Sequence, residues 1–260
     1  MSTRLYRLQG IRNFRDFGDY PAADGRRVVA GRLFRSASLS GPSDADLAQL
    51  DALGVRLVVD LRREYERQRE PSRWPRGQHA RTVSGPAQLQ AAGTPTFIEF
   101  LNRPGVTAAE ARAFTVAAFR DIALDPLYLQ LFGDGLRAIA QADGAVVVHC
   151  SQGKDRTGIL CALLQRILGV PLETVLEDFE LTNVAIDLEE RLQEAHDAFA
   201  RRYGIDASAE VLEPMLGVHA EYLLAAFDGM RDRHGSIDGY LGAIGVDPEV
   251  RAALRQRFLA

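Results

Sequence analysis

Ten residues near the middle of the chain read His149-Cys150-Ser151-Gln152-Gly153-Lys154-Asp155-Arg156-Thr157-Gly158. A β-branched apolar run, 145–148, precedes them, and an apolar stretch with helical character, 159–168, follows them. This order predicts a strand, a tight loop and a helix, as in an α/β protein. A loop in that position directs its backbone N–H groups to a point above the helix N-terminus, where the helix dipole also favours an anion. The stretch therefore predicts an anion site between a strand and a helix.

Four residues in this stretch suit one type of chemistry. A thiol reacts as its thiolate, and a helix N-terminus, amide N–H groups and a nearby arginine all favour that form of Cys150. Arg156 offers a planar fork that matches two phosphate oxygens. Gly153 allows the loop to turn sharply, and Thr157 is placed to hydrogen-bond the sulfur as it leaves. The predicted reaction is phosphoryl transfer to Cys150, followed by hydrolysis of the thiophosphate.

The rest of the loop is expected to form the phosphate cradle. Lys154 is the only lysine in the chain, and we expect it to add positive charge at the floor of the site. His149 is expected to orient the loop rather than to touch the substrate. The predicted phosphate-binding residues are Ser151, Gln152, Gly153, Lys154, Asp155, Arg156 and Thr157.

Other interpretations of the loop remain open at this stage. Cys150 could be an inert buried thiol beside a surface arginine. A silent phosphate-binding module would keep Arg156 but would not need the thiolate, and a sulfurtransferase would need neither Arg156 nor the Thr157-Gly158 pair.

Two aspartates are candidates for the general acid that protonates the leaving oxygen. Asp155 lies within the loop, where a structural salt bridge is the alternative role. Asp60 ends a predicted buried strand, 55–60, and the carboxyl ends of parallel strands line the ligand crevice of a sheet. If this strand neighbours 145–149, Asp60 comes close to Cys150; otherwise it caps the next helix or makes a structural hydrogen bond.

The motif Cys-x5-Arg, preceded by His and followed by Thr-Gly, resembles the signature of the cysteine-dependent protein tyrosine phosphatase superfamily. The full string HCSQGKDRTG is similar to a bacterial branch of atypical tyrosine and phosphoinositide phosphatases. Asp60-Leu61-Arg62 with Glu66 matches a motif of the same branch, as do segments 13–16 and 31–36 near the N-terminus. C-terminal segments resemble the family too, so the likeness covers nearly the whole chain.

This resemblance implies a fold, an activity and a set of substrates. The fold is a small, mostly parallel sheet flanked by helices, with a helical C-terminal half. The activity is hydrolysis of phosphotyrosine, with phosphoserine, phosphothreonine and phosphoinositides as further substrates, without a metal or another cofactor. Some phosphoinositide-type members use an aspartate within the loop as the acid, which favours Asp155 over Asp60.

The chain pattern predicts a single domain, 1–260, that is mainly helical after residue 107. Segment 71–106 contains five prolines and no sustained periodicity. In the resembled family this region is a lid or insertion, so we expect a mobile cover over the loop, with a disordered connection as the alternative. Segment 62–70 is densely charged and predicts a solvated helix face. The expected C-terminal helices are 172–180, 183–203, 208–230, 236–243 and 248–258.

Composition limits the possible functions and locations. A net charge of −4 argues against binding to nucleic acid or to an anionic membrane surface. No apolar run approaches the length of a membrane span, and residues 1–7 do not resemble a signal peptide. The two cysteines, Cys150 and a predicted buried Cys161, indicate a reducing compartment. We therefore expect a cytoplasmic protein, with secretion by a non-standard route and the oligomeric state left open.

Overall fold

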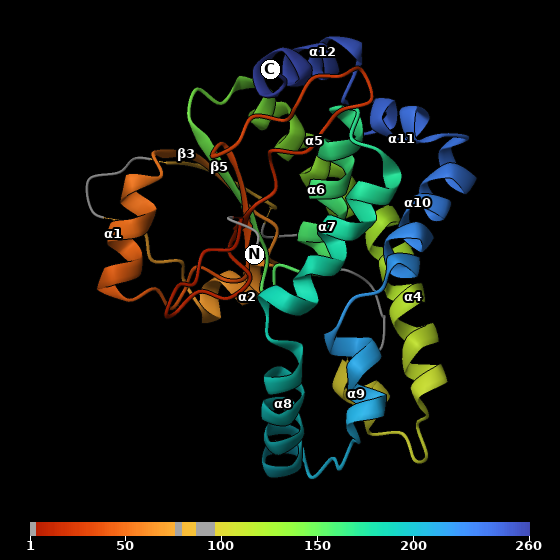
Figure 1. Cartoon of the computed structure of the whole chain (residues 1–260). Helices are drawn as coiled ribbons and strands as arrows, with labels where there is room; N and C mark the ends of the chain where they lie inside the picture. Colours follow the sequence, from red (N-terminus) through yellow and green to blue (C-terminus); the bar gives the residue numbers. More distant parts are fainter. Residues whose placement is uncertain (1–3, 76–79, 87–96) are drawn as a thin grey trace.

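The computed structural model describes residues 4–75, 80–86 and 97–260, and it confirms the predicted α/β fold (Figure 1). Its sheet is mostly parallel: the central β5 pairs in parallel with β2 and β3, β3 pairs in parallel with β4, and only β1 is antiparallel. The spatial order is β1 (Arg15–Asp16), β2 (Leu33–Ser36), β5 (Ala145–His149), β3 (Val55–Asp60) and β4 (Arg81–Ser84).

Alternate side chains of the central strand enter two different cores. Val146 and Val148 belong to the larger core, which lies beneath the helices of the second half of the chain. Val147 points to the opposite face, where Phe14 and Phe34 form a smaller core. A strand buried on both faces must be apolar at every position, and this explains the uninterrupted run that precedes Cys150.

Helices cover both faces of the sheet, with α1 on one side and α5, α6 and α7 on the other (Figure 1). The described helices are α1 (Asp44–Ala52), α2 (Glu64–Arg69), α3 (Phe97–Leu101), α4 (Ala108–Leu124), α5 (Pro126–Gln141), α6 (Asp155–Ile167), α7 (Leu172–Ala185), α8 (Leu188–Tyr203), α9 (Ala209–Leu216), α10 (Ala220–His234), α11 (Ile237–Ala243) and α12 (Pro248–Phe258).

Two predicted helix boundaries in the C-terminal half are wrong. The expected break after residue 180 is absent, and α7 continues until the chain turns at Asp187, which adopts a left-handed conformation with φ 50°. The expected helix 208–230 is split into α9 and α10. Between them, the Asn183 side-chain amide donates to the Val218 carbonyl and accepts from the Val218 N–H, both at 2.8 Å, and so satisfies the backbone where the helix is interrupted.

Segment 71–106 contains regular structure that the sequence pattern does not reveal. Residues 81–84 form the edge strand β4, whose side chains are mostly exposed and therefore show no apolar alternation. Residues 76–79 and 87–96 of the predicted cover lie outside the described residues, and the cover stays a prediction.

A third apolar cluster lies apart from the two cores of the sheet. It joins α3, α8, α9 and the start of α4 through side chains such as Phe100, Ala195, Leu212 and Met215. Figure 1 shows α8 and α9 side by side at one end of the molecule. We call this group the satellite cluster, and it adjoins the predicted phosphate loop.

Candidate active site

The loop after β5 has the geometry that the sequence predicts. Cys150 directly follows the strand and is 2% exposed, and α6 begins five residues later at Asp155. Gly153 turns the loop with φ 65°, and a Cβ at this position would overlap the backbone of Ser36 on the neighbouring strand. Only glycine meets both requirements. The loop therefore curls from the end of β5 to the N-terminus of α6, with the thiol at its base.

Arg156 lies in the first turn of α6, and a carboxylate fixes its guanidinium group. Glu66 of α2 accepts from Nη1 at 2.6 Å through Oε2 and from Nη2 at 3.0 Å through Oε1. The Leu61 carbonyl also accepts from Nη1, at 3.2 Å. The interactions of Arg156 with Cys150, Tyr128 and Glu66 outweigh the effect of burial and raise its pKa, so the guanidinium is fully charged.

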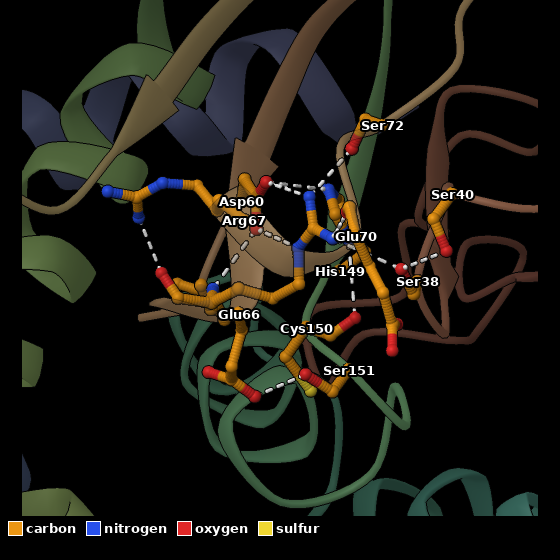
Figure 2. A network of polar contacts seen from close by, with 12 residues as sticks. Ser38, Ser40, Asp60, Glu66, Arg67, Glu70, Ser72, His149, Cys150 and Ser151 are labelled. Carbon is orange, nitrogen blue, oxygen red and sulfur yellow. Dashed lines mark hydrogen bonds and ion pairs between the residues drawn. The ribbon is translucent and has the colours of Figure 1, made fainter. Parts of the chain in front are cut away.

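Glu66 also contacts the loop and the start of its own helix. The Ser151 hydroxyl donates to Oε1 (Figure 2). The Arg63 N–H donates to Oε2 at 2.7 Å. Burial acts to raise the pKa of Glu66, but the ion pair with Arg156 and these hydrogen bonds lower it to about 2. The prediction of a solvated face for segment 62–70 is wrong for Arg62, which is buried, and for Glu66, which is largely so. The motif that Glu66 shares with the resembled family was the only sequence signal for this role.

Asp60 lies close to the loop, as expected if its strand neighbours β5. The strands are adjacent, and Asp60 lies opposite His149 in their register. However, Arg62 hydrogen-bonds both carboxylate oxygens of Asp60. Oδ1 accepts from Nε at 2.9 Å and Oδ2 accepts from Nη2 at 2.7 Å (Figure 2). Burial acts to raise the pKa of Asp60, but the nearby His149 and Arg62 hold it below the ordinary value.

His149, the last residue of β5, is completely buried and lies close to this ion pair. Its Nε2 lies 3.5 Å from Asp60 Oδ2, and its Nδ1 lies 3.3 Å from the carbonyl oxygen of Cys150. Burial lowers the pKa of His149 below its ordinary value of 6.5, so the ring is neutral at pH 7. The ring therefore contacts the Asp60 carboxylate on one side and the backbone at the start of the loop through its other nitrogen.

Lys154 has partners that the sequence did not suggest. We expected its charge at the floor of the anion site, but its ammonium donates to the carbonyls of Met215 at 2.5 Å and Gly217 at 3.3 Å. The same ammonium lies 3.3 Å from Asp155 Oδ1. These contacts link the loop to the end of α9 and to the satellite cluster. A cation is favourable there because the helix dipole is negative at the C-terminus.

Asp155 opens α6, and about a third of its side chain is exposed. It lines a cavity of about 260 Å³ together with Gln152 and Lys154. The rest of the lining is mainly apolar and includes Phe97, Ile186, Phe199, Met215 and Leu216. The loop thus borders a cavity whose lining combines polar loop residues with apolar side chains from other segments.

Thr157 and Cys161 lie deeper in α6. The Thr157 hydroxyl is buried and has no hydrogen-bond partner among the described residues. Cys161 is fully buried, and burial raises the pKa of its thiol to about 12. Its environment is that of a small apolar residue, because an uncharged thiol packs as one.

The sequence as a whole was compared with known proteins. A model of the tyrosine phosphatase family matches residues 6–260. The chain belongs to this family. It is therefore a protein tyrosine phosphatase, an enzyme that hydrolyses phosphoric monoesters, and its substrates are phosphorylated molecules.

Individual members of the family match over most of their length. A Cupriavidus necator protein, provisionally named a tyrosine-protein phosphatase, is 34% identical over 96% of this chain and 86% of its own. The triple specificity protein phosphatase PtpB of Mycobacterium tuberculosis is 30% identical over 92% of this chain and 93% of its own. A tyrosine-protein phosphatase of Nostoc commune is 28% identical over 91% of this chain and 77% of its own. Among the described residues, no helix is both long and apolar enough to cross a membrane.

Proposed function

We propose that the enzyme hydrolyses phosphomonoesters through a thiophosphate intermediate on Cys150. The sulfur attacks phosphorus, the S–P bond forms and the bond from phosphorus to the leaving oxygen breaks. Asp155 gives its proton to that oxygen. A water molecule then attacks phosphorus, Asp155 takes up a proton from it, and the S–P bond breaks to release inorganic phosphate and the thiolate.

One observation carries this proposal: the thiol at the end of β5 and a fully charged arginine in the first turn of the next helix are close enough to interact electrostatically. Glu66 holds Nη1 and Nη2 of Arg156, which leaves the Nε–H edge of the guanidinium for the substrate. The transferring group carries its charge on equatorial oxygens, and a fixed arginine stabilises that charge without reorganising during the reaction. The unpartnered Thr157 hydroxyl supports the predicted hydrogen bond to the departing sulfur.

The surroundings of the two aspartates favour Asp155 as the general acid. A general acid must hold a proton that it can release to the leaving group. Asp60 accepts hydrogen bonds from Arg62 and has a lowered pKa, so it remains ionised. Among the described residues, Asp155 pairs with the Lys154 ammonium rather than with an arginine, and it borders the cavity beside the loop.

We propose phosphotyrosine as the main substrate, with phosphoserine, phosphothreonine and phosphoinositides as further substrates. The apolar wall formed by Phe97 and Phe199 suits an aromatic ring held next to Asp155. Arg191 of the same cavity adds a cation for an acidic peptide or an inositol phosphate. The name of the Mycobacterium tuberculosis relative, a triple specificity phosphatase, supports a broad range.

Two expectations about the molecule as a whole remain proposals. We propose that residues 1–260 form one catalytic domain. A cytoplasmic location is supported by the two cysteines, both of which are free and buried.

The test is hydrolysis of p-nitrophenyl phosphate and of a phosphotyrosine peptide, without added metal, by wild type, Cys150→Ser, Asp155→Asn and Asp60→Asn. Activity should vanish in Cys150→Ser. Because the peptide has the poorer leaving group, Asp155→Asn should lose about 10²–10⁴ in rate on it and much less on p-nitrophenyl phosphate. Equal losses on both substrates in Asp155→Asn, with a selective loss in Asp60→Asn, would transfer the role to Asp60.

Two further outcomes would contradict the cysteine mechanism. Wild type that binds phosphate but hydrolyses neither substrate, nor soluble phosphoinositides, would be a binding module. Formation of a persulfide on Cys150 from thiosulfate, without phosphatase activity, would indicate a sulfurtransferase.

A further inference from the structure

A group of buried charged residues lies against the phosphate loop, and the mechanism above does not use it. Arg15 of β1, Arg35 of β2 and Asp178 of α7 are each at most 1% exposed. Asp178 lies between the two arginines, 3.7 Å from Arg15 Nε and 3.3 Å from Arg35 Nη1. Burying three ionised groups costs free energy of folding unless the groups are well paired and hydrogen-bonded.

Arg35 of this group and the neighbouring Asn13 hold carbonyl oxygens of the loop. Asn13 donates through Nδ2 to the carbonyls of Gln152 at 3.1 Å and Gly153 at 2.9 Å. Arg35 Nη2 donates to the same Gly153 carbonyl at 3.0 Å. Arg15 donates to the Asn13 side-chain oxygen and thereby fixes the orientation of the amide. The backbone of Asn13 is left-handed, with φ 58°, a conformation that asparagine tolerates better than most residues.

These hydrogen bonds determine where the loop N–H groups point. In a planar trans peptide the C=O and N–H groups point in opposite directions. The Gln152 carbonyl shares its peptide with the Gly153 N–H, and the Gly153 carbonyl shares its peptide with the Lys154 N–H. Holding both carbonyls toward Asn13 and Arg35 therefore turns these two N–H groups away from them, toward the concave side of the loop.

The group also carries more positive than negative charge. Burial lowers the pKa of Arg15 to about 10, which leaves it charged at pH 7. Together with Arg35, the group has two guanidinium groups against the one carboxylate of Asp178. The other titratable groups that act on Arg15 are Tyr20, which donates its hydroxyl to Asp178, and Cys161, and burial raises the pKa of both. Among the described residues of this group, one positive charge is thus not neutralised.

That charge lies close to the anion site. Arg35 Nη2 contacts the Gly153 carbonyl, and it would lie 3.5 Å from a Cβ placed on Gly158 in the first turn of α6. The charge is shielded from solvent by the protein, so its field on a bound anion is stronger than that of a surface arginine.

We propose that Asn13 and Arg35, supported by Arg15 and Asp178, are positioning residues that orient the loop amides and stabilise a bound phosphoryl dianion with one buried positive charge. The proposal rests on the proposed function for the identity of the ligand as a phosphoryl group. It predicts that these residues affect oxyanion affinity even though none of them touches the substrate.

The experiment measures tungstate binding by calorimetry, without turnover, for wild type and four variants whose folding is checked by thermal unfolding. Arg35→Met should weaken tungstate binding by about tenfold or more, because a hydrogen bond to the loop and the unneutralised charge are both lost. Arg35→Lys should recover part of the affinity, since it retains the charge. Asn13→Gly tolerates the left-handed backbone and removes only the amide, and should weaken binding by about threefold to tenfold.

Tyr20→Phe is the matched control. It removes a hydrogen bond to the same Asp178 carboxylate but leaves both arginines and the loop contacts in place. Its tungstate affinity should stay within about twofold of wild type even if its thermal stability falls. If Arg35→Met does not fold, the comparison of Asn13→Gly with Tyr20→Phe decides the question.

Several outcomes would overturn the proposal. Wild-type affinity in Arg35→Met or in Asn13→Gly would do so, as would a loss in Tyr20→Phe equal to that in the loop variants. Binding is separate from turnover, so wild type that binds tungstate but hydrolyses nothing would contradict the proposed function alone. Wild type that hydrolyses substrate, together with variants that bind tungstate as tightly as wild type, would contradict only the positioning role.

Discussion

The carboxylate of Glu66 and the guanidinium of Arg156 form a two-point ion pair, with N–O distances of 2.6 and 3.0 Å. The pair joins α2 to the first turn of α6 across the mouth of the phosphate loop. Since Ser151 of the loop donates to the same carboxylate, Glu66 connects both sides of the site. An arginine held by two bonds has little freedom to leave the position in which it meets the substrate.

Replacing Glu66 should therefore reduce activity. In Glu66→Gln the ion pair is lost and Arg156 becomes free to adopt other rotamers, and we expect kcat/KM for p-nitrophenyl phosphate to fall by about tenfold to a hundredfold. Glu70→Gln is the control, because its side chain pairs with Arg69 at the surface. Equal activities of the two variants would show that Glu66 does not position the arginine.

The same residue should make stability depend on pH. The pKa of Glu66 is about 2 in the folded protein and 4.5 ordinarily. A lowered pKa stabilises the fold above pH 4.5, by about 3 kcal/mol at neutral pH, and this contribution is lost as the pH falls from 4.5 toward 2. The difference in unfolding free energy between wild type and Glu66→Gln, measured with urea, should shrink between pH 7 and pH 3. A difference that is constant over this range would contradict the assigned pKa.

Arg62 should be important for stability. Arg62→Met would leave the Asp60 carboxylate buried without its partner and would also remove the hydrogen bond to the Glu70 carbonyl at 2.7 Å. We expect the unfolding free energy to fall by about 3–5 kcal/mol. Arg69→Met, at an exposed position at the end of the following helix α2, should change it by less than about 0.5 kcal/mol. A loss below 1 kcal/mol in Arg62→Met would mean that Asp60 finds other partners.

The two thiols should differ in reactivity. Cys161 is fully buried and burial raises its pKa to about 12, so it should resist iodoacetamide in the folded enzyme. Cys150 should be alkylated at neutral pH, and inorganic phosphate should protect it. Peptide mass spectrometry after a short exposure would check both statements, and modification of Cys161 in folded Cys150→Ser would contradict the first.

The parts of the site that the sequence predicts are those formed by neighbouring residues. The strand, loop and helix around Cys150 are recognisable because an apolar run, a glycine turn and an apolar helical stretch follow one another within about two dozen residues. The proximity of Asp60 also follows from its place at a strand end, because strand ends of a parallel sheet meet. The helical second half follows from the chain pattern, and the family resemblance agrees with it.

The missed features depend on pairings between distant segments. Asn13 meets the loop 140 residues further along the chain, and the Lys154 ammonium meets carbonyls at Met215 and Gly217. No periodicity encodes such contacts. Charged residues such as Arg62 and Glu66 suggest a solvated surface when each is considered alone, and only the fold shows that they neutralise partners inside it.

The most direct test of the central claim is to trap the intermediate. Wild type and Cys150→Ser are mixed with a phosphotyrosine peptide, quenched in acid during turnover and analysed by peptide mass spectrometry. We predict one phosphoryl group on the wild-type peptide that contains Cys150, and none in the variant. Turnover by Cys150→Ser, or wild-type turnover with phosphate on another residue, would contradict the mechanism.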